Sequence, residues 1–151
     1  MYRQINRDLY GITSLIFILT ALIVADIDLL EEHMVAGIFY SIIIIVATGL
    51  LLFTFCMKCP CKNHCGHLIP GRIAMHFKTR KTGPYTNTDN IIVSLSLLSL
   101  IVFPQLWLWE NRGLFLIFWI ILIIGIIQIR SVVCRSCENV YCPLNAKIKD
   151  V

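Results

Sequence analysis

The chain is too apolar for a soluble domain. Of its 151 residues 58% are hydrophobic and 15% are charged, and the mean hydropathy is +0.79. Soluble domains are about half apolar and about a quarter charged. The apolar residues also come in long runs rather than in alternation, so the sequence predicts a single domain of the all-α integral membrane class.

Four apolar runs follow one another, and each is predicted to cross the membrane as an α-helix. A spanning helix needs about 20 apolar residues, and a helix satisfies its own backbone polar groups in lipid. The predicted spans are residues 9–25, 34–55, 91–109 and 114–129. The connectors 26–33 and 110–113 are very short, so we expect two antiparallel helical hairpins.

Two details of the spans concern helix packing. Pro104 and Gln105 interrupt the third span. We expect a tolerated kink with the amide bonded to a neighbouring helix, the alternative being a quinone or ligand contact at Gln105. Gly37, Gly49 and Gly125 allow close helix contact within this chain, with another copy or with a foreign subunit.

The charged residues predict the orientation of the chain. With four spans, both termini and the 56–90 loop share one side, which holds all of the 13 basic residues except Arg112. Basic loop residues stay in the cytoplasm, so both termini and all seven cysteines are predicted to be cytoplasmic. Because this topology accounts for the positive charge, we expect no nucleic-acid partner.

The 56–90 loop contains a basic stretch after Pro70-Gly71. Residues 72–81 are predicted to form a helix lying in the membrane interface, and the alternative is an irregular basic loop. Its cations suit anionic lipid headgroups. The expected membrane-surface residues are Arg72, Lys78, Arg80 and Lys81. Further on, Thr88 or Asp89 is expected to cap the third span.

All seven cysteines lie outside the spans, in two groups. The first group is Cys56, Cys59, Cys61 and Cys65, with His64 and His67 beside them, and the second is Cys134, Cys137 and Cys142. Each group begins with a Cys-x2-Cys pair soon after a span. A pair of this kind can direct two thiolates at one metal ion, and two pairs make a tetrahedral four-sulfur site. We therefore predict that 56–90 and 130–151 form one cytoplasmic metal-binding cap.

The ligands can be divided in more than one way. The simplest site is Cys56, Cys59, Cys134 and Cys137. Cys61, Cys65 and Cys142 would then complete a second set with His64 or His67. The alternatives to metal are structural thiols, disulfides, which the predicted cytoplasmic side disfavours, and palmitoylation at a cysteine such as Cys56.

The cysteine spacing predicts a metal site more clearly than it predicts which metal is bound. Zinc and iron–sulfur clusters both use thiolates in groups of four. Neighbouring histidines and the Cys65-Gly66 turn favour zinc, whereas Cys142-Pro143 and the crowded first group favour iron–sulfur. The membrane context suits redox chemistry, so iron–sulfur is the preferred prediction.

The arrangement resembles that of the four-span membrane ferredoxins of quinol-dehydrogenase type, whose cytoplasmic cysteine motifs also follow spans. Their Cys-x3-Cys-Pro motif is absent here. Cys61-Lys62-Asn63-His64-Cys65 is followed by Gly66, and Cys142-Pro143 follows a four-residue gap. The resemblance is one of layout, and we do not assign the chain to that family.

These patterns lead to one preferred function and two alternatives. We expect a small membrane subunit whose cysteine-ligated centres transfer electrons within a larger membrane complex, and not a stand-alone enzyme. The alternatives are an accessory or assembly subunit with a structural zinc site, and a thiol-based redox or metal sensor. The expected partners are the lipid bilayer and either other subunits or a second copy of the chain.

Overall fold

The protein is all-helical in the part that the structure describes, with five α-helices and no strands. The structure is a computed structural model, and it describes residues 2–61, 65, 68–76, 82–135, 137, 139, 141 and 142. The helical elements are α1 (Tyr2–Glu32), α2 (Met34–Leu51), η1 (Leu52–Cys56), α3 (Leu68–His76), α4 (Asn87–Leu108), α5 (Arg112–Gln128) and η3 (Ile129–Cys134). Here η denotes a turn of π-helix.

Four helices are long and apolar enough to cross a membrane, as predicted. The four candidate spans are Arg7–Glu32, Met34–Cys56, Asn87–Leu108 and Arg112–Cys134. Most of their large apolar side chains face outward, including Ile45 at 73% and Leu106 at 69% exposure. An apolar exterior of this extent is compatible with a membrane protein.

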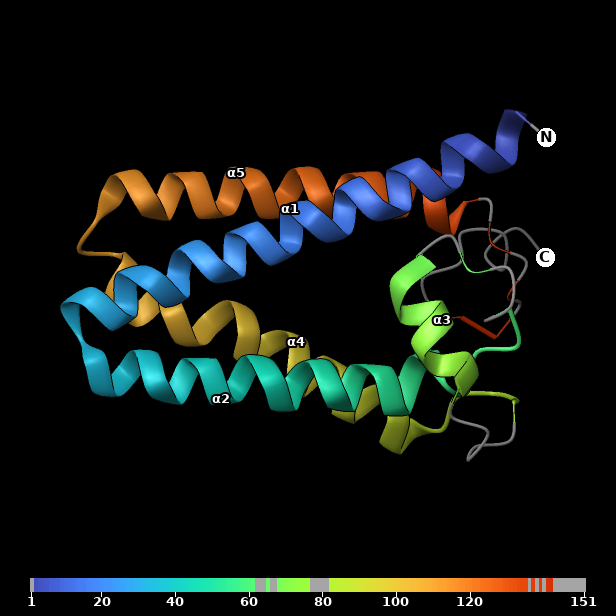
Figure 1. Ribbon diagram of the computed structural model, residues 1–151. Helices are drawn as coiled ribbons and strands as arrows, with labels where there is room; N and C mark the ends of the chain where they lie inside the picture. Colours follow the sequence, from blue (N-terminus) through green and yellow to red (C-terminus); the bar gives the residue numbers. More distant parts are fainter. Residues whose placement is uncertain are drawn as a thin grey trace.

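The four long helices lie side by side in two layers, with α1 and α5 in one layer and α2 and α4 in the other (Figure 1). The most extensive contacts are those of α1 with α5, followed by those of α2 with α4 and of α1 with α2. Consecutive long helices run in opposite directions. The start of α1 and the ends of α2 and α5 lie at one end of the bundle (Figure 1).

Helix α1 continues well past Ala25, where the first span was expected to end. It includes Asp26 and stops at Glu32, so His33 alone separates it from α2. Asp26 is accommodated because the Ser41 hydroxyl lies 3.1 and 2.9 Å from its two carboxylate oxygens and donates to them. The acidic connector predicted from the sequence is therefore mostly the last turns of a helix.

Two of the three glycines that were expected at helix contacts lie at contacts within this chain. A Cβ at Gly37 would fall 2.7 Å from the backbone nitrogen of Leu30 on α1. A Cβ at Gly125 would fall 3.3 Å from the carbonyl oxygen of Ser14, also on α1. Gly49 has open space around it. The small residues thus let α2 and α5 approach α1 closely.

Gln105 is bonded to a neighbouring helix, as the sequence predicted, and Pro104 lies inside α4. The Gln105 carbonyl accepts a 3.1 Å hydrogen bond from the Trp119 indole of α5, and its amide donates to the Ile101 carbonyl at 3.0 Å. Proline has no N–H, so Pro104 leaves the carbonyl of Leu100 without its helical donor. Tyr40 of α2 donates to that carbonyl at 2.9 Å.

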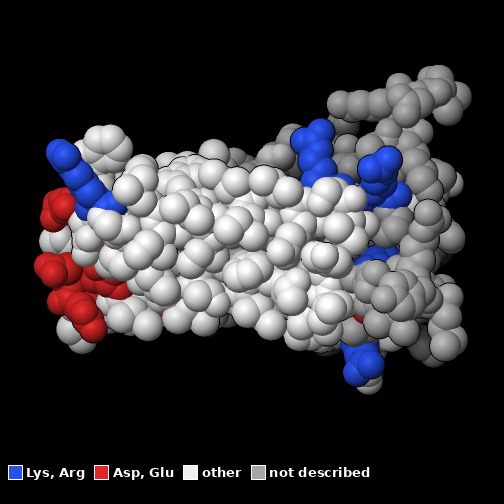
Figure 2. Space-filling model, turned by 90° about the horizontal axis from the view of Figure 1, so that it is seen from above, with Lys and Arg blue, Asp and Glu red and all other residues white. Residues whose placement is uncertain are grey.

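The two ends of the bundle differ in charge (Figure 2). The end at which α1 meets α2 carries Asp28, Glu31, Glu32 and Glu110, with Arg112. The described basic residues near the other end are Arg7, Lys58, Arg72, Arg130 and Arg135. The face between the ends is white in Figure 2, without charged side chains.

Candidate metal centre

Both cysteine groups begin where a long helix ends. Helix α2 continues into η1, which closes at Cys56, and α5 continues into η3, which closes at Cys134. In each case a hydroxyl donates at 2.6 Å to the carbonyl four residues before it, from Thr54 and from Ser131. Such bonds compete with the helical ladder and favour a local change of helical winding. Both cysteine groups therefore follow the same local structure, a turn of π-helix that contains a hydroxyl bonded to the backbone.

The two Cys-x2-Cys pairs also make the same turn. The Cys59 N–H donates to the Cys56 carbonyl at 3.3 Å, and the Cys137 N–H donates to the Cys134 carbonyl at 3.2 Å. In the first group the N–H of Cys61 also donates to the Cys59 sulfur. Backbone N–H groups directed at a cysteine sulfur are typical of thiolate metal sites.

Cysteines of the two groups lie near one another, although they are far apart in the sequence. The Cys65 thiol is within electrostatic range of both Cys56 and Cys134. The Cys59 thiol interacts in the same way with Cys137. No disulfide joins the cysteines, all of which lie in the described part of the chain. The end of the bundle thus gathers sulfur atoms from both groups.

The arrangement does not amount to a complete set of metal ligands. Among the described residues no three side chains of His, Cys, Asp or Glu converge on a position that would hold a metal ion. His64 and His67 lie outside the described residues, as do Lys78, Arg80 and Lys81. The four-sulfur site and the second ligand set therefore stay predictions.

Cys59 has the most closely defined surroundings of the seven. The side-chain amide of Asn139 donates to its sulfur at 3.4 Å, and Asn139 itself is 2% exposed. The hydroxyl of Tyr85 also hydrogen-bonds this sulfur. Burial and the charge of Cys137 raise the pKa of the Cys59 thiol, while the hydrogen bonds from Cys61, Tyr85 and Asn139 lower it, and the net direction is upward.

Tyr85 is held in place by its ring and by its hydroxyl. The ring stacks on Phe55, with 4.5 Å between the centroids, and the hydroxyl accepts a 3.2 Å hydrogen bond from Asn139. Burial, followed by the nearby charge of Cys59, raises the pKa of Tyr85. The hydroxyl therefore keeps its proton and can act as a donor. Neither Tyr85 nor Asn139 was predicted from the sequence, where the position of Asn139 between Cys137 and Cys142 was the available signal.

An ion pair ties the first cysteine group to the start of α4. Lys58, between Cys56 and Cys59, places its ammonium 2.5 Å from a carboxylate oxygen of Asp89, and both side chains are largely buried. Asp89 also completes a capping box with Thr86, whose hydroxyl accepts from the Asp89 N–H at 3.3 Å. The expected cap at Thr88 or Asp89 is thus corrected: Thr86 is the cap, and Asp89 is its partner three residues later.

Helix α3 (Leu68–His76) includes residues 72–76 of the helix predicted over 72–81 and begins four residues earlier, while residues 77–81 lie outside the described part of the chain. Figure 1 shows α3 lying across the end of the bundle. Gly71 and Ala74 are buried, while Ile69, Arg72 and Ile73 are exposed. Arg72 therefore has the exposure that a membrane-surface residue requires.

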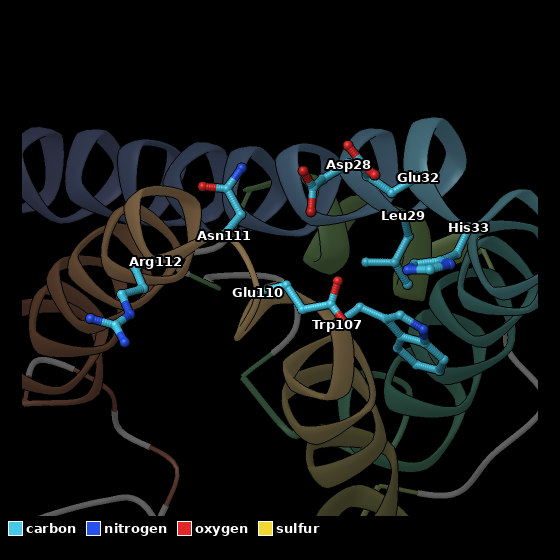
Figure 3. Close-up of a pocket in the computed structure, with 8 residues that line it drawn as sticks. All are labelled: Asp28, Leu29, Glu32, His33, Trp107, Glu110, Asn111 and Arg112. Carbon is cyan, nitrogen blue, oxygen red and sulfur yellow. The ribbon is translucent and has the colours of Figure 1, made fainter.

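The opposite end of the bundle contains a hollow that no motif in the sequence indicates. Its volume is about 490 Å³, and it is lined by Asp28, Leu29, Glu32, His33, Trp107, Glu110, Asn111 and Arg112. Figure 3 shows Glu110, which follows α4, on the side facing Asp28 and Glu32 of α1, whereas Arg112 points away. No ion pair within the described residues includes these carboxylates.

Comparisons with known proteins add no constraint to this site. The chain matches no protein-family model, no curated protein and no solved structure.

Proposed function

We propose that the protein is an integral membrane protein whose four long helices cross the bilayer as two hairpins, with the cysteine groups in the cytoplasm. The proposal is supported by the uncharged, apolar exterior between the two ends of the bundle. It is also supported by the charge difference, because basic residues near spans stay on the cytoplasmic side. Once bound metal has been removed by a membrane-permeant chelator, a membrane-impermeant maleimide should then label the cysteines in inverted membrane vesicles but not in intact cells.

The cysteine-rich end would serve as a metal-binding cap, and iron–sulfur is the form of metal that we propose for it. The observation that carries the proposal is the contact between the two cysteine groups, in which the side-chain amide of Asn139, between Cys137 and Cys142, donates to the Cys59 sulfur at 3.4 Å. Iron–sulfur clusters are held by cysteine thiolates in sets of four. The ligands would come from the seven cysteines, with His64 or His67 available to a second set.

The chemistry proposed for this cap is electron transfer. A bound cluster would supply exchange of one electron between a donor and an acceptor redox centre in partner subunits. The chain's own residues would hold the cluster at the membrane face and shield its sulfurs from water. Hydrogen bonds to the sulfurs, such as those received by Cys59, are among the factors that set the potential of such centres.

A second function is favoured by the matching turns of the two Cys-x2-Cys pairs. The N–H bonds of 3.3 and 3.2 Å after Cys56 and Cys134 suit a closed tetrahedral zinc site. Such a site would join two cytoplasmic segments of a non-catalytic accessory subunit, and chelation would unfold the cap.

Anaerobic purification of the full chain in detergent separates the two functions. Brown protein with broad visible absorption, iron and acid-labile sulfide supports electron transfer. Colourless protein with stoichiometric zinc would replace that function by the structural one. Protein without either metal would exclude both.

Cysteine variants test whether the cap needs both groups. We expect Cys134→Ser and Cys137→Ser to lose metal about as severely as Cys56→Ser, while the exposed-site control Ser94→Ala keeps it. If the two C-terminal variants bind metal normally, the first group binds alone and the shared cap is wrong.

A further inference from the structure

The exposed side of α3 carries large apolar residues where a helix surrounded by water would carry polar ones. Ile69 is 53% exposed and Ile73 is 40% exposed, and Arg72 and His76 are exposed beside them. Residues three and four apart lie on the same side of a helix, so these four side chains form one continuous surface, here called the outer stripe. The outer stripe is thus apolar at two positions and carries the cation of Arg72 between them.

The opposite side of α3 is small and buried. Gly71 and Ala74, three residues apart, are both buried, and α3 packs against η1 and α1. Because η1 is the last part of the candidate span Met34–Cys56, α3 lies beside the end of that span. Figure 1 shows α3 across the end of the bundle rather than along it. In a bilayer that surrounds the spans, α3 would therefore lie in the membrane interface with its axis along the surface.

The end of the bundle around α3 is positively charged. Two described carboxylates lie at this end, and each is already paired, Asp8 with Arg7 and Asp89 with Lys58. The exposed basic residues at this end that have no ion pair within the described part of the chain are Arg72, Arg130 and Arg135. An anionic lipid surface attracts basic side chains that lie close to it. The charge of this end therefore complements anionic headgroups.

The outer stripe combines a cation with apolar side chains, and a soluble anion would use only the cation. A guanidinium can bind phosphate in water, whereas exposed Ile69 and Ile73 gain stability from contact with hydrocarbon. A phospholipid supplies both partners, because its phosphate is joined to its acyl chains. A lipid headgroup therefore matches the stripe better than free phosphate does.

We propose that the outer stripe of α3 is a docking surface for anionic phospholipids, with Arg72 at the headgroup phosphate and Ile69 and Ile73 at the boundary between headgroups and acyl chains. This inference rests on the proposed insertion of the four spans in a bilayer, and it does not depend on a bound metal. Since α3 packs against η1, which ends at Cys56, docking holds the first cysteine group at the membrane surface.

The test is hydrogen exchange of the α3 amides, measured by mass spectrometry on the full chain in lipid nanodiscs. One set of discs contains phosphatidylcholine alone, and the other contains equal parts of phosphatidylcholine and the anionic phosphatidylglycerol. Arg72→Gln removes the cation, and a double variant with Ile69→Ser and Ile73→Ser removes the apolar contacts. Arg130→Gln is the matched control, because Arg130 is an exposed arginine at the same end but on η3. Each variant is compared with itself in the two lipids, so a general change in helix stability cancels.

We expect the α3 amides of the wild type to exchange about fivefold more slowly when phosphatidylglycerol is present, the effect expected of one basic side chain at an anionic surface. Arg72→Gln and the double isoleucine variant should each lose most of this difference, because one lacks the charge and the other lacks the contacts that keep α3 at the headgroups. Arg130→Gln should keep the difference.

The docking surface is overturned by equal exchange of wild-type α3 in both lipids, by an equal loss in Arg130→Gln, or by the same slowing with inorganic phosphate in discs of phosphatidylcholine alone. The amides of the four long helices report separately on insertion. Fast exchange along those helices in the discs would overturn the proposed membrane insertion, whereas protected helices with an unresponsive α3 would overturn the docking alone.

Discussion

The hydroxyl of Tyr40 donates at 2.9 Å to the carbonyl of Leu100, the group that Pro104 leaves without a helical donor. Tyr40 is fully buried between α2 and α4. Its ring also stacks on Phe103, with 5.7 Å between centroids. The carbonyl that Pro104 leaves without a helical donor is therefore satisfied by a side chain of the neighbouring helix, and this bond is part of the α2–α4 contact.

Tyr40→Phe should lower the free energy of unfolding by about 1 to 3 kcal/mol, because it leaves a buried carbonyl without a donor. In a Pro104→Ala background the new N–H can bond to that carbonyl, so the same change should cost about 1 kcal/mol less. The measurement is a double-mutant cycle of unfolding in mixed detergent micelles, with the exposed Tyr10→Phe as control. Equal costs in both backgrounds would contradict the link to Pro104.

Gly37 and Gly49 of α2 should respond in opposite ways to alanine. At Gly37 the added Cβ meets the backbone of Leu30 at 2.7 Å, whereas at Gly49 it meets nothing within 4 Å. We expect Gly37→Ala to destabilise the protein by about 1 to 3 kcal/mol through overpacking. Gly49→Ala should be neutral or stabilising by about 0.5 to 1 kcal/mol, because alanine is the better helix former. Thermal unfolding followed by circular dichroism compares them, and similar melting temperatures would mean that α1 and α2 are not in this close contact.

Ser41→Ala should weaken the contact between α1 and α2, since Ser41 donates to the carboxylate of Asp26. A loss of about 1 kcal/mol is expected from removal of a hydrogen bond to a charged group at a partly buried site. Ser94→Ala, on an exposed position of α4, provides the control in the same unfolding assay. If both variants unfold alike, the Ser41 bond does not contribute to the packing.

Lys58→Met should destabilise the cysteine-rich end by about 3 kcal/mol, because it leaves the buried carboxylate of Asp89 without its cation. Arg72→Met is the control, since Arg72 is exposed on α3. Hydrogen exchange at the start of α4 should rise in the first variant alone. Unchanged protection there would show that the ion pair does not hold the first cysteine group against α4.

The sequence predicted the long helices well, because each apolar run is long enough to be read without knowledge of its neighbours. Their ends were harder to predict. Asp26 was assigned to a connector because a carboxylate within an apolar helix is unfavourable, and the partner that stabilises it, Ser41, is known only from the fold. The cap of α4 was predicted two or three residues too late for a related reason. Thr86, Thr88 and Asp89 can all cap a helix, and only the fold shows that Thr86 does so.

The cysteine groups could be predicted to approach each other, because their helices end at the same side. The surroundings of Cys59 could not. Asn139 and Tyr85 reach it from segments separated by 80 and 26 residues in the numbering, and nothing in their local sequence distinguishes them from solvent-exposed loop residues. Such contacts depend on tertiary packing, which a single sequence does not display.

The π turns η1 and η3 lead directly into the two cysteine groups. The direction in which Cys56 and Cys134 point therefore depends on the number of residues in each turn. Successive residues of a helix are rotated by about 100°. Removing one residue from Leu52–Cys56 would therefore turn Cys56 by about that angle relative to the bundle. The same deletion in the loop at 82–85, which has no helical winding, can be absorbed locally. Among natural variants of this chain, we thus expect single-residue deletions in the loop at 82–85 and none within η1 or η3.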